Sequence, residues 1–159
     1  TGINRGTLYN SFGDKDTFFK SCIDQYNKVV DTQIAATLKN SKLGPWEAIE
    51  AYLDETVLNV TIKHRSMGCL LVNSVCESIN YDKEMRKVVR GSLSSMRKNL
   101  LARLKEAHKN RKMKKGVSAE FAAEVLMNSL HGIRVNSRDG KTPKQLKELI
   151  KFNVASLKK

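Results

Sequence analysis

The first fifteen residues contain the side chains best suited to forming hydrogen bonds with another molecule. A helix is predicted over about residues 4–12, where Leu8 and Phe12 lie four positions apart and share a face that can pack inward. The polar residues around them can donate to base edges or phosphates, and they are Asn4, Arg5, Thr7, Tyr9, Asn10 and, just after the helix, Lys15. This pattern indicates a helix that packs on one face and can enter a DNA groove with the other.

The next residues predict a tight turn into a second helix. Gly13 is suited to ending the first helix, because glycine adopts the left-handed conformation without steric cost. Asp14 can then cap the second helix by accepting a backbone hydrogen bond at its start. An ordinary helical hairpin with a solvated polar face would show the same spacing, so the spacing alone leaves both interpretations open.

Elsewhere the chain has no pattern typical of catalysis or metal binding. His64, His108 and His131 fall on three separate segments, so no two of them have the i, i+4 spacing of a helical metal site. The sequence also lacks a glycine-rich phosphate loop, a nucleophile elbow and a His-Glu metal motif. We therefore expect a protein that is not an enzyme, with no catalytic residue, no metal and no cofactor.

The three cysteines, Cys22, Cys69 and Cys76, are an odd number and lack metal-ligand spacing. On one helix Cys69 and Cys76 would be separated by about 10 Å of rise, which is too far for a disulfide. We expect three reduced thiols. A regulator that senses redox state or electrophiles through Cys69 or Cys76 is one alternative function.

Size and charge limit the class of protein. A chain of 159 residues, 40% of them hydrophobic, suits one domain with a real core. No run approaches the roughly 20 apolar residues of a membrane span and no signal peptide is evident, so we expect a cytoplasmic protein. The net charge is +13, and residues 83–115 hold thirteen Lys and Arg against two Glu, a net of +11. This surplus fits a solvated helix face, or alternatively a module that binds polyanions without sequence specificity.

The spacing of apolar residues at three and four predicts an all-α chain with about seven helices and no strand. Start signals support the boundaries, with Asp82, Ser118 and Thr142 as predicted caps and Pro45 and Pro143 at first helical positions. The expected helices cover residues 4–12, 14–39, 45–63, 68–79, 82–108, 118–137 and 142–157.

Two motifs resemble the TetR/AcrR family of transcriptional regulators. The segment Gly6-Thr7-Leu8-Tyr9 with Phe12 and then Lys15-Asp16 is similar to the family's turn and recognition helix, and the resemblance is strong over residues 1–26. The segment Met67-Gly68-Cys69-Leu70-Leu71-Val72-Asn73 is similar to the start of the sixth helix in one branch of the family. Family members carry about 35 further residues before the turn, so by this comparison the head is N-terminally incomplete.

The resemblance implies a domain organisation and a function. Residues 1–26 would be the C-terminal part of a DNA-binding helix-turn-helix head, with its recognition helix at about residues 4–12, and residues 27–159 would bind a ligand and dimerise. The expected protein is a homodimeric transcriptional regulator, a repressor released from a palindromic double-stranded operator by an unknown small apolar or amphipathic effector. No membrane partner is expected.

The resemblance also favours a ligand cavity over plain core packing for a group of aromatic, sulfur-containing and polar residues in the body. The predicted ligand-binding residues are Trp46, Tyr52, Met67, Cys69, Asn73, Cys76, Met96 and Phe121. The last two helices are implied to form the dimer interface. The predicted interface residues are Leu126, Leu130, Ile133, Leu146 and Ile150.

Overall fold

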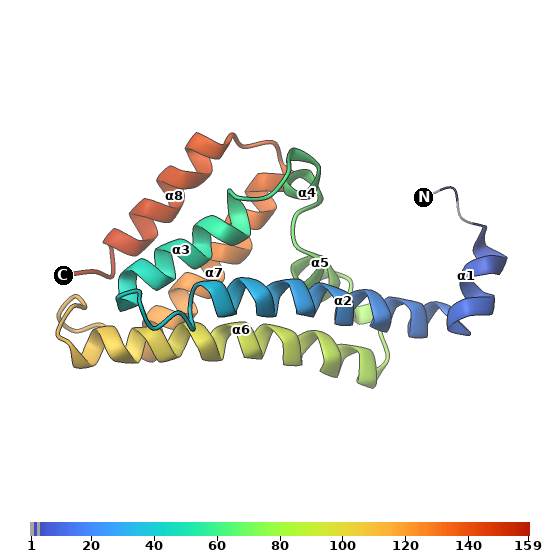
Figure 1. Ribbon diagram of the computed structural model, residues 1–159, viewed down its shortest axis with the longest axis horizontal. Helices are drawn as coiled ribbons and strands as arrows, with labels where there is room; N and C mark the ends of the chain where they lie inside the picture. Colours follow the sequence, from blue (N-terminus) through green and yellow to red (C-terminus); the bar gives the residue numbers. More distant parts are fainter. Residues whose placement is uncertain (1, 3) are drawn as a thin grey trace.

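The computed structural model describes residue 2 and residues 4–159, apart from the side chain of Tyr9 (Figure 1). Within this part of the chain all regular structure is helical apart from an isolated bridge between Met113 and Lys158, so the prediction of an all-α fold is confirmed. The α-helices are α1 (Arg5–Phe12), α2 (Lys15–Ala36), α3 (Pro45–Val57), α4 (Ile62–Met67), α5 (Leu70–Cys76), α6 (Lys83–Lys109), α7 (Ala119–Arg138) and α8 (Pro143–Ala155), and a 3₁₀ turn, η1, covers Ser78–Asn80.

Four helices begin with the side-chain caps that the sequence predicts. Asp14 accepts a hydrogen bond from the backbone N–H of Thr17 at 2.7 Å. Asp82 and Ser118 each cap the same way, and Thr142 forms a reciprocal capping box with Gln145. Each cap satisfies a backbone donor that would otherwise lack a partner at the helix start, and this is why the boundaries could be predicted.

Two predicted helices have different bounds in the structure. The helix expected over residues 45–63 ends at Val57, and Thr61 caps a separate short helix, α4, by accepting from the N–H of His64. The helix expected over residues 68–79 is only α5, because Gly68 at φ 74° precedes it and η1 follows it. The apolar composition of residues 68–79 predicts burial on most sides, and this is wrong for Val75, Cys76 and Ile79, which are exposed.

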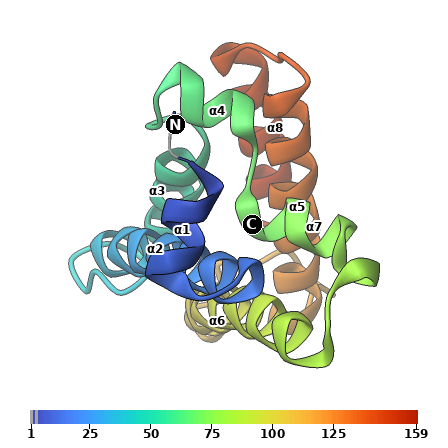
Figure 2. The same cartoon turned by 90° about the vertical axis from the view of Figure 1, so that its right-hand side faces the viewer.

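Helices α2 and α6 run side by side along the length of the molecule, while α3, α7 and α8 pack over one half of this pair (Figures 1 and 2). The core between them consists mainly of aliphatic residues, among which Ile34, Ile49, Leu100, Leu104 and Leu126 are almost fully buried. The guanidinium of Arg103 on α6 donates to the backbone carbonyls of Leu38 and Asn40, both at 2.6 Å. This contact fixes the chain where it leaves α2.

Helix α1 lies at the far end of α2, away from α8 (Figure 1). Gly13, at φ 86°, makes the turn between α1 and α2, which confirms the predicted role of this glycine. The rings of Phe12 and Phe18 then meet edge to face with centroids 5.1 Å apart. The orientation of α1 is therefore coupled to that of α2.

Candidate functional site

The polar residues predicted to contact DNA lie on an exposed surface at the α1 end of the chain. Arg5, Thr7, Asn10 and Lys15 all have exposed side chains. The side-chain oxygen of Asn4 accepts from the backbone N–H of Gly6 at 2.8 Å, so this residue also contributes to the start of α1. The side chain of Tyr9 lies outside the described residues, and its predicted contact stays a prediction.

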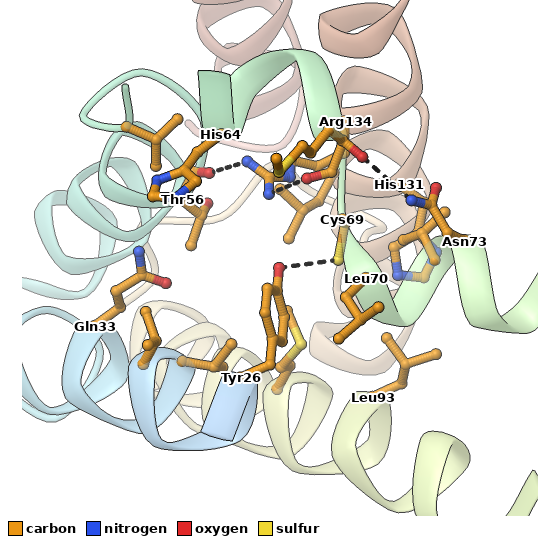
Figure 3. Close-up of a pocket in the computed structure, with 18 residues that line it drawn as sticks. Tyr26, Gln33, Thr56, His64, Cys69, Leu70, Asn73, Leu93, His131 and Arg134 are labelled. Atoms are coloured by element: carbon orange, nitrogen blue, oxygen red, sulfur yellow. Dashed lines mark hydrogen bonds between the residues drawn. The ribbon is translucent and has the colours of Figure 1, made fainter. Parts of the chain in front are cut away.

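A second surface is internal, where six helices and the turn between α4 and α5 line a cavity of about 430 Å³ (Figure 3). This size falls within the range of about 300–1,000 Å³ that small-molecule pockets occupy. Helix α2 provides one wall and α7 the opposite one. The lining residues are Tyr26, Val29, Val30, Gln33, Thr56, Val60, His64, Met67, Gly68, Cys69, Leu70, Val72, Asn73, Leu93, Met96, Leu130, His131 and Arg134.

The turn at Gly68 gives part of this lining its shape. A side chain at this position would be strained at φ 74°, and a Cβ atom there would lie 3.6 Å from the backbone carbonyl of Arg134. This distance is an ordinary contact, so the positive φ is the reason that the turn favours glycine. Just beyond the turn, the amide of Asn73 donates to the carbonyl of Met67 at 3.2 Å, which ties the start of α5 to the end of α4.

Arg134 on α7 holds the cavity wall together from inside. Its side chain is buried, with 8% of the residue exposed. The guanidinium donates to the carbonyl of Thr56, near the end of α3, and to the carbonyl of Gly68, both at 2.5 Å. In Figure 3 these bonds appear at the upper edge of the cavity. One cation thus links three separate segments of the lining.

Two tyrosines, Tyr26 and Tyr52, lie near Arg134. The hydroxyl of Tyr26 donates to the sulfur of Cys69 at 3.3 Å across the cavity (Figure 3). Burial raises the pKa of Tyr26 above its ordinary value, and the neighbouring Cys69 contributes to the shift. Burial also raises the pKa of Tyr52. Both phenols are therefore neutral at physiological pH.

His131 contributes a second polar group from α7. Its Nε2 atom is buried and has no hydrogen-bond partner within the described part of the chain. Burial lowers the pKa of His131 below its ordinary value, because the charged imidazolium is disfavoured away from water. A neutral ring nitrogen without a partner is thus available where the ring lines the cavity.

Half of the predicted ligand-binding residues line this cavity and half do not. Met67, Cys69, Asn73 and Met96 are among its lining residues. The other four, Trp46, Tyr52, Cys76 and Phe121, do not line this cavity, and their contact with a ligand stays a prediction.

Tertiary packing places these four residues outside the lining of the cavity. The indole nitrogen of Trp46 donates to the carbonyl of Lys112 at 2.9 Å, so this ring braces the loop after α6. Tyr52 is fully buried in the core behind the cavity. Cys76 is exposed on α5, and Phe121 is 62% exposed on α7.

The five predicted interface residues also need correction, because Leu126, Leu130, Ile133, Leu146 and Ile150 are all buried within this single chain. Their apolar stripes are covered by contacts among α3, α6, α7 and α8. Other large apolar side chains on α7 and α8 remain exposed. They are Phe121, Val135 and Phe152.

Several polar lining residues were missed by sequence reasoning, notably Tyr26, Gln33 and Arg134. A signal for Arg134 was present, since it follows Leu130 and precedes Ser137 at the spacing of the buried face of α7. A cation on an otherwise apolar helix face indicates either a buried clamp or a ligand contact. Tyr26 and Gln33 carry no comparable signal.

Two further observations concern metals and membranes. Among the residues that the structure describes, no three His, Cys, Asp or Glu side chains are grouped so that they could hold a metal ion. The helices of residues 4–159 include none that combines the length and the apolar character needed to cross a membrane.

Comparison with known proteins gives the family. Residues 45–152 match the family model of the tetracyclin repressor-like C-terminal domain. No curated protein sequence matches significantly.

Solved structures of similar fold cover nearly the whole chain. A TetR regulatory protein from Rhodobacter sphaeroides superposes with a TM-score of 0.85 at 16% identity, over 98% of this chain and 82% of that one. A TetR family regulator from Agrobacterium tumefaciens gives 0.80 at 17% identity, over 99% and 82%. The reduced form of NemR from E. coli gives 0.75 at 16% identity, over 98% and 80%. Since the family model covers most of the chain, this protein belongs to the TetR family of transcriptional regulators.

Proposed function

We propose that this protein is a repressor that binds a palindromic operator as a homodimer and is released by a small apolar or amphipathic effector bound in the cavity. The observation that carries the proposal is the dual use of α2. Its first residues follow directly on α1, whose polar side chains are exposed, and its middle forms one wall of the cavity. A molecule in the cavity would therefore press on the helix that positions α1.

The coupling between the two sites has a simple physical basis. Tyr26, Val29 and Gln33 lie on the cavity side of α2, about three turns or more from α1. A ligand that fits only when α2 has moved away from α7 would favour the released state, because it binds that state more tightly. Reciprocity then requires operator DNA to weaken ligand binding by the same factor, typically about 5- to 150-fold.

Dimerisation through α7 and α8 is supported by the apolar side chains left exposed on them. Phe121, Val135 and Phe152 are large and exposed, and partly buried Val125 and Leu149 lie on the same helices. Apolar surface of this kind is commonly covered by a symmetric copy of the same helices. In such a dimer α1 of each copy would lie at one end of its own α2, which suits binding to two half-sites.

The test is a selection of duplex DNA from a random library by the protein, expressed together with any residues that precede Thr1 in its gene. We expect enrichment of a palindrome whose half-sites are about one helical turn, roughly 34–36 Å, apart. The matched control is a variant in which exposed Arg5 and Asn10 are both replaced by alanine, which should enrich no sequence. Equal binding to specific and random DNA by the unaltered protein would instead support a polyanion-binding module and contradict this proposal.

A further inference from the structure

The guanidinium of Arg134 is a buried positive charge without a negative partner. Its two hydrogen-bond acceptors are the backbone carbonyls of Thr56 and Gly68, which are dipoles and carry no net charge. The ion pairs within residues 4–159 do not include Arg134. Buried charges in proteins are usually paired, because an unpaired charge away from water is unfavourable. A negatively charged group next to Arg134 would therefore be stabilising.

The surroundings do not provide that group. The lining of the cavity contains no Asp or Glu. Tyr26 and Tyr52 are neutral phenols, because burial raises the pKa of each. The side chain of Arg138 passes near Gly68, where its Cδ atom lies 3.5 Å from the position of an added Cβ, but Arg138 is exposed and does not line the cavity. No side chain that lines the cavity therefore balances the charge of Arg134.

From these observations we infer that the effector is an amphipathic organic anion whose carboxylate pairs with Arg134 while its apolar part packs against the side chains of α2 and α6 that line the cavity. This inference deepens the proposed function and rests on it. A guanidinium has five N–H donors, and the two carbonyls occupy one on each terminal nitrogen, so donors remain for a carboxylate. The other end of the cavity is lined by apolar side chains such as Val30, Leu93 and Met96, which suit an apolar tail.

His131 supports the same orientation. It precedes Arg134 by three residues on α7, so both side chains lie on neighbouring positions of one helix surface. Its buried Nε2 atom has no partner among the described residues and lines the same cavity. A neutral imidazole can donate one hydrogen bond to an anionic ligand without adding charge of its own. The site thus offers one charged and one neutral polar group.

The experiment compares three probes that share a decyl tail and differ in the charge of the head: decanoate, decanol and decyltrimethylammonium. Binding of each to the unaltered protein is measured by calorimetry at neutral pH. We expect decanoate to bind about tenfold or more tightly than decanol, because charge-assisted hydrogen bonds are roughly twice as strong as neutral ones. Decyltrimethylammonium should bind most weakly. This ranking needs no variant, so it tests the negative charge of the head group even if a variant fails to fold.

Variants then locate the preference. Arg134→Met should abolish the advantage of decanoate over decanol, whereas Arg134→Lys, which keeps the charge, should retain part of it. Arg138→Met is the matched control, because it removes an exposed cation one helical turn away and should leave the advantage unchanged. Cys69→Phe, which fills the cavity, should abolish binding of all three probes.

The outcomes separate this inference from the proposed function. Equal binding of decanoate and decanol, abolished by Cys69→Phe, would show a cavity that binds ligands but would overturn the anionic head and leave Arg134 as a structural clamp. An advantage of decanoate that survives Arg134→Met would also overturn it. No binding by any probe, or binding that Cys69→Phe leaves intact, would overturn the inference. That result would also contradict effector binding in the cavity as part of the proposed function. The selection of duplex DNA described above would still test operator binding.

Discussion

The proposed dimer interface can be tested most directly at Phe152 on α8. This residue is 73% exposed in the single chain. A phenylalanine offers about 200 Å² of surface, so complete coverage would remove about 150 Å² from water in each copy. At about 25 cal/mol per Å², two copies would contribute at most about 7 kcal/mol to association.

Only part of that value appears as affinity, because association also has costs in translational, rotational and side-chain freedom. We therefore expect Phe152→Ala to weaken the dimer by about 2–4 kcal/mol, the range typical of a central aromatic interface residue. This corresponds to an increase of about 30- to 1,000-fold in the dimer dissociation constant. The free energy of unfolding of the monomer should change little, since an exposed side chain contributes little to the core.

Sedimentation equilibrium over a range of protein concentrations measures this dissociation constant directly. Ile79→Ala is the matched control, because Ile79 is 86% exposed but lies in η1, outside α7 and α8. An unchanged dissociation constant for Phe152→Ala, or equal weakening by both variants, would refute the assignment of the interface to α7 and α8.

Three further predictions follow from the cavity and the head. Cys69→Phe should abolish release of operator DNA by the effector while operator affinity stays unaltered, because the ring fills the cavity and leaves the exposed polar side chains of α1 unchanged. Gel-shift titration with and without effector measures this, and normal induction would place the ligand elsewhere. Arg5→Ala should weaken operator binding by about 1–3 kcal/mol and relax its sequence specificity. Lys15→Ala should weaken binding to every DNA sequence and reduce the slope of log affinity against log salt concentration by about one. Unchanged affinities in gel-shift titrations over a range of salt would exclude this docking. Burial holds the pKa of His131 in the folded protein below its ordinary value of 6.5, so as pH falls the imidazole is protonated in the unfolded chain before it is protonated in the folded one. The free energy of unfolding therefore decreases from about pH 6.5 downward. His131→Gln should therefore show a smaller fall in the urea midpoint than the unaltered protein between about pH 7.5 and pH 5.5, and an identical fall would contradict the assignment.

Local features of the sequence determined most of the secondary structure. Asp14, Asp82, Ser118 and Thr142 mark helix starts, because a side chain that caps a helix acts on backbone groups only a few residues away. Gly13 likewise marks the turn after α1 through its own backbone conformation. Such signals require no knowledge of distant parts of the chain, which explains why they could be read in advance.

The sequence could not predict which apolar side chains lie in the core and which lie on the surface. Helix α7 carries apolar residues on more than one face, and the pattern alone does not say which face packs inside the chain. Leu126 and Leu130 were therefore predicted at the interface although they are buried, and Phe121 was predicted in the cavity although it is exposed. The answer depends on where α6 and α8 lie against α7, which is a property of the tertiary structure.

By itself the sequence determined an all-α chain, the position of the polar helix α1 and the resemblance to a family, because these depend on periodicity and short motifs. Only the tertiary structure decided which residues share the cavity. Tyr26 and Cys69 are 43 positions apart, and Arg134 contacts carbonyls 78 and 66 positions away. That Arg134 is buried and takes part in no ion pair within residues 4–159 is likewise decided by the tertiary structure, since the sequence alone does not show which side chains folding brings next to a cation.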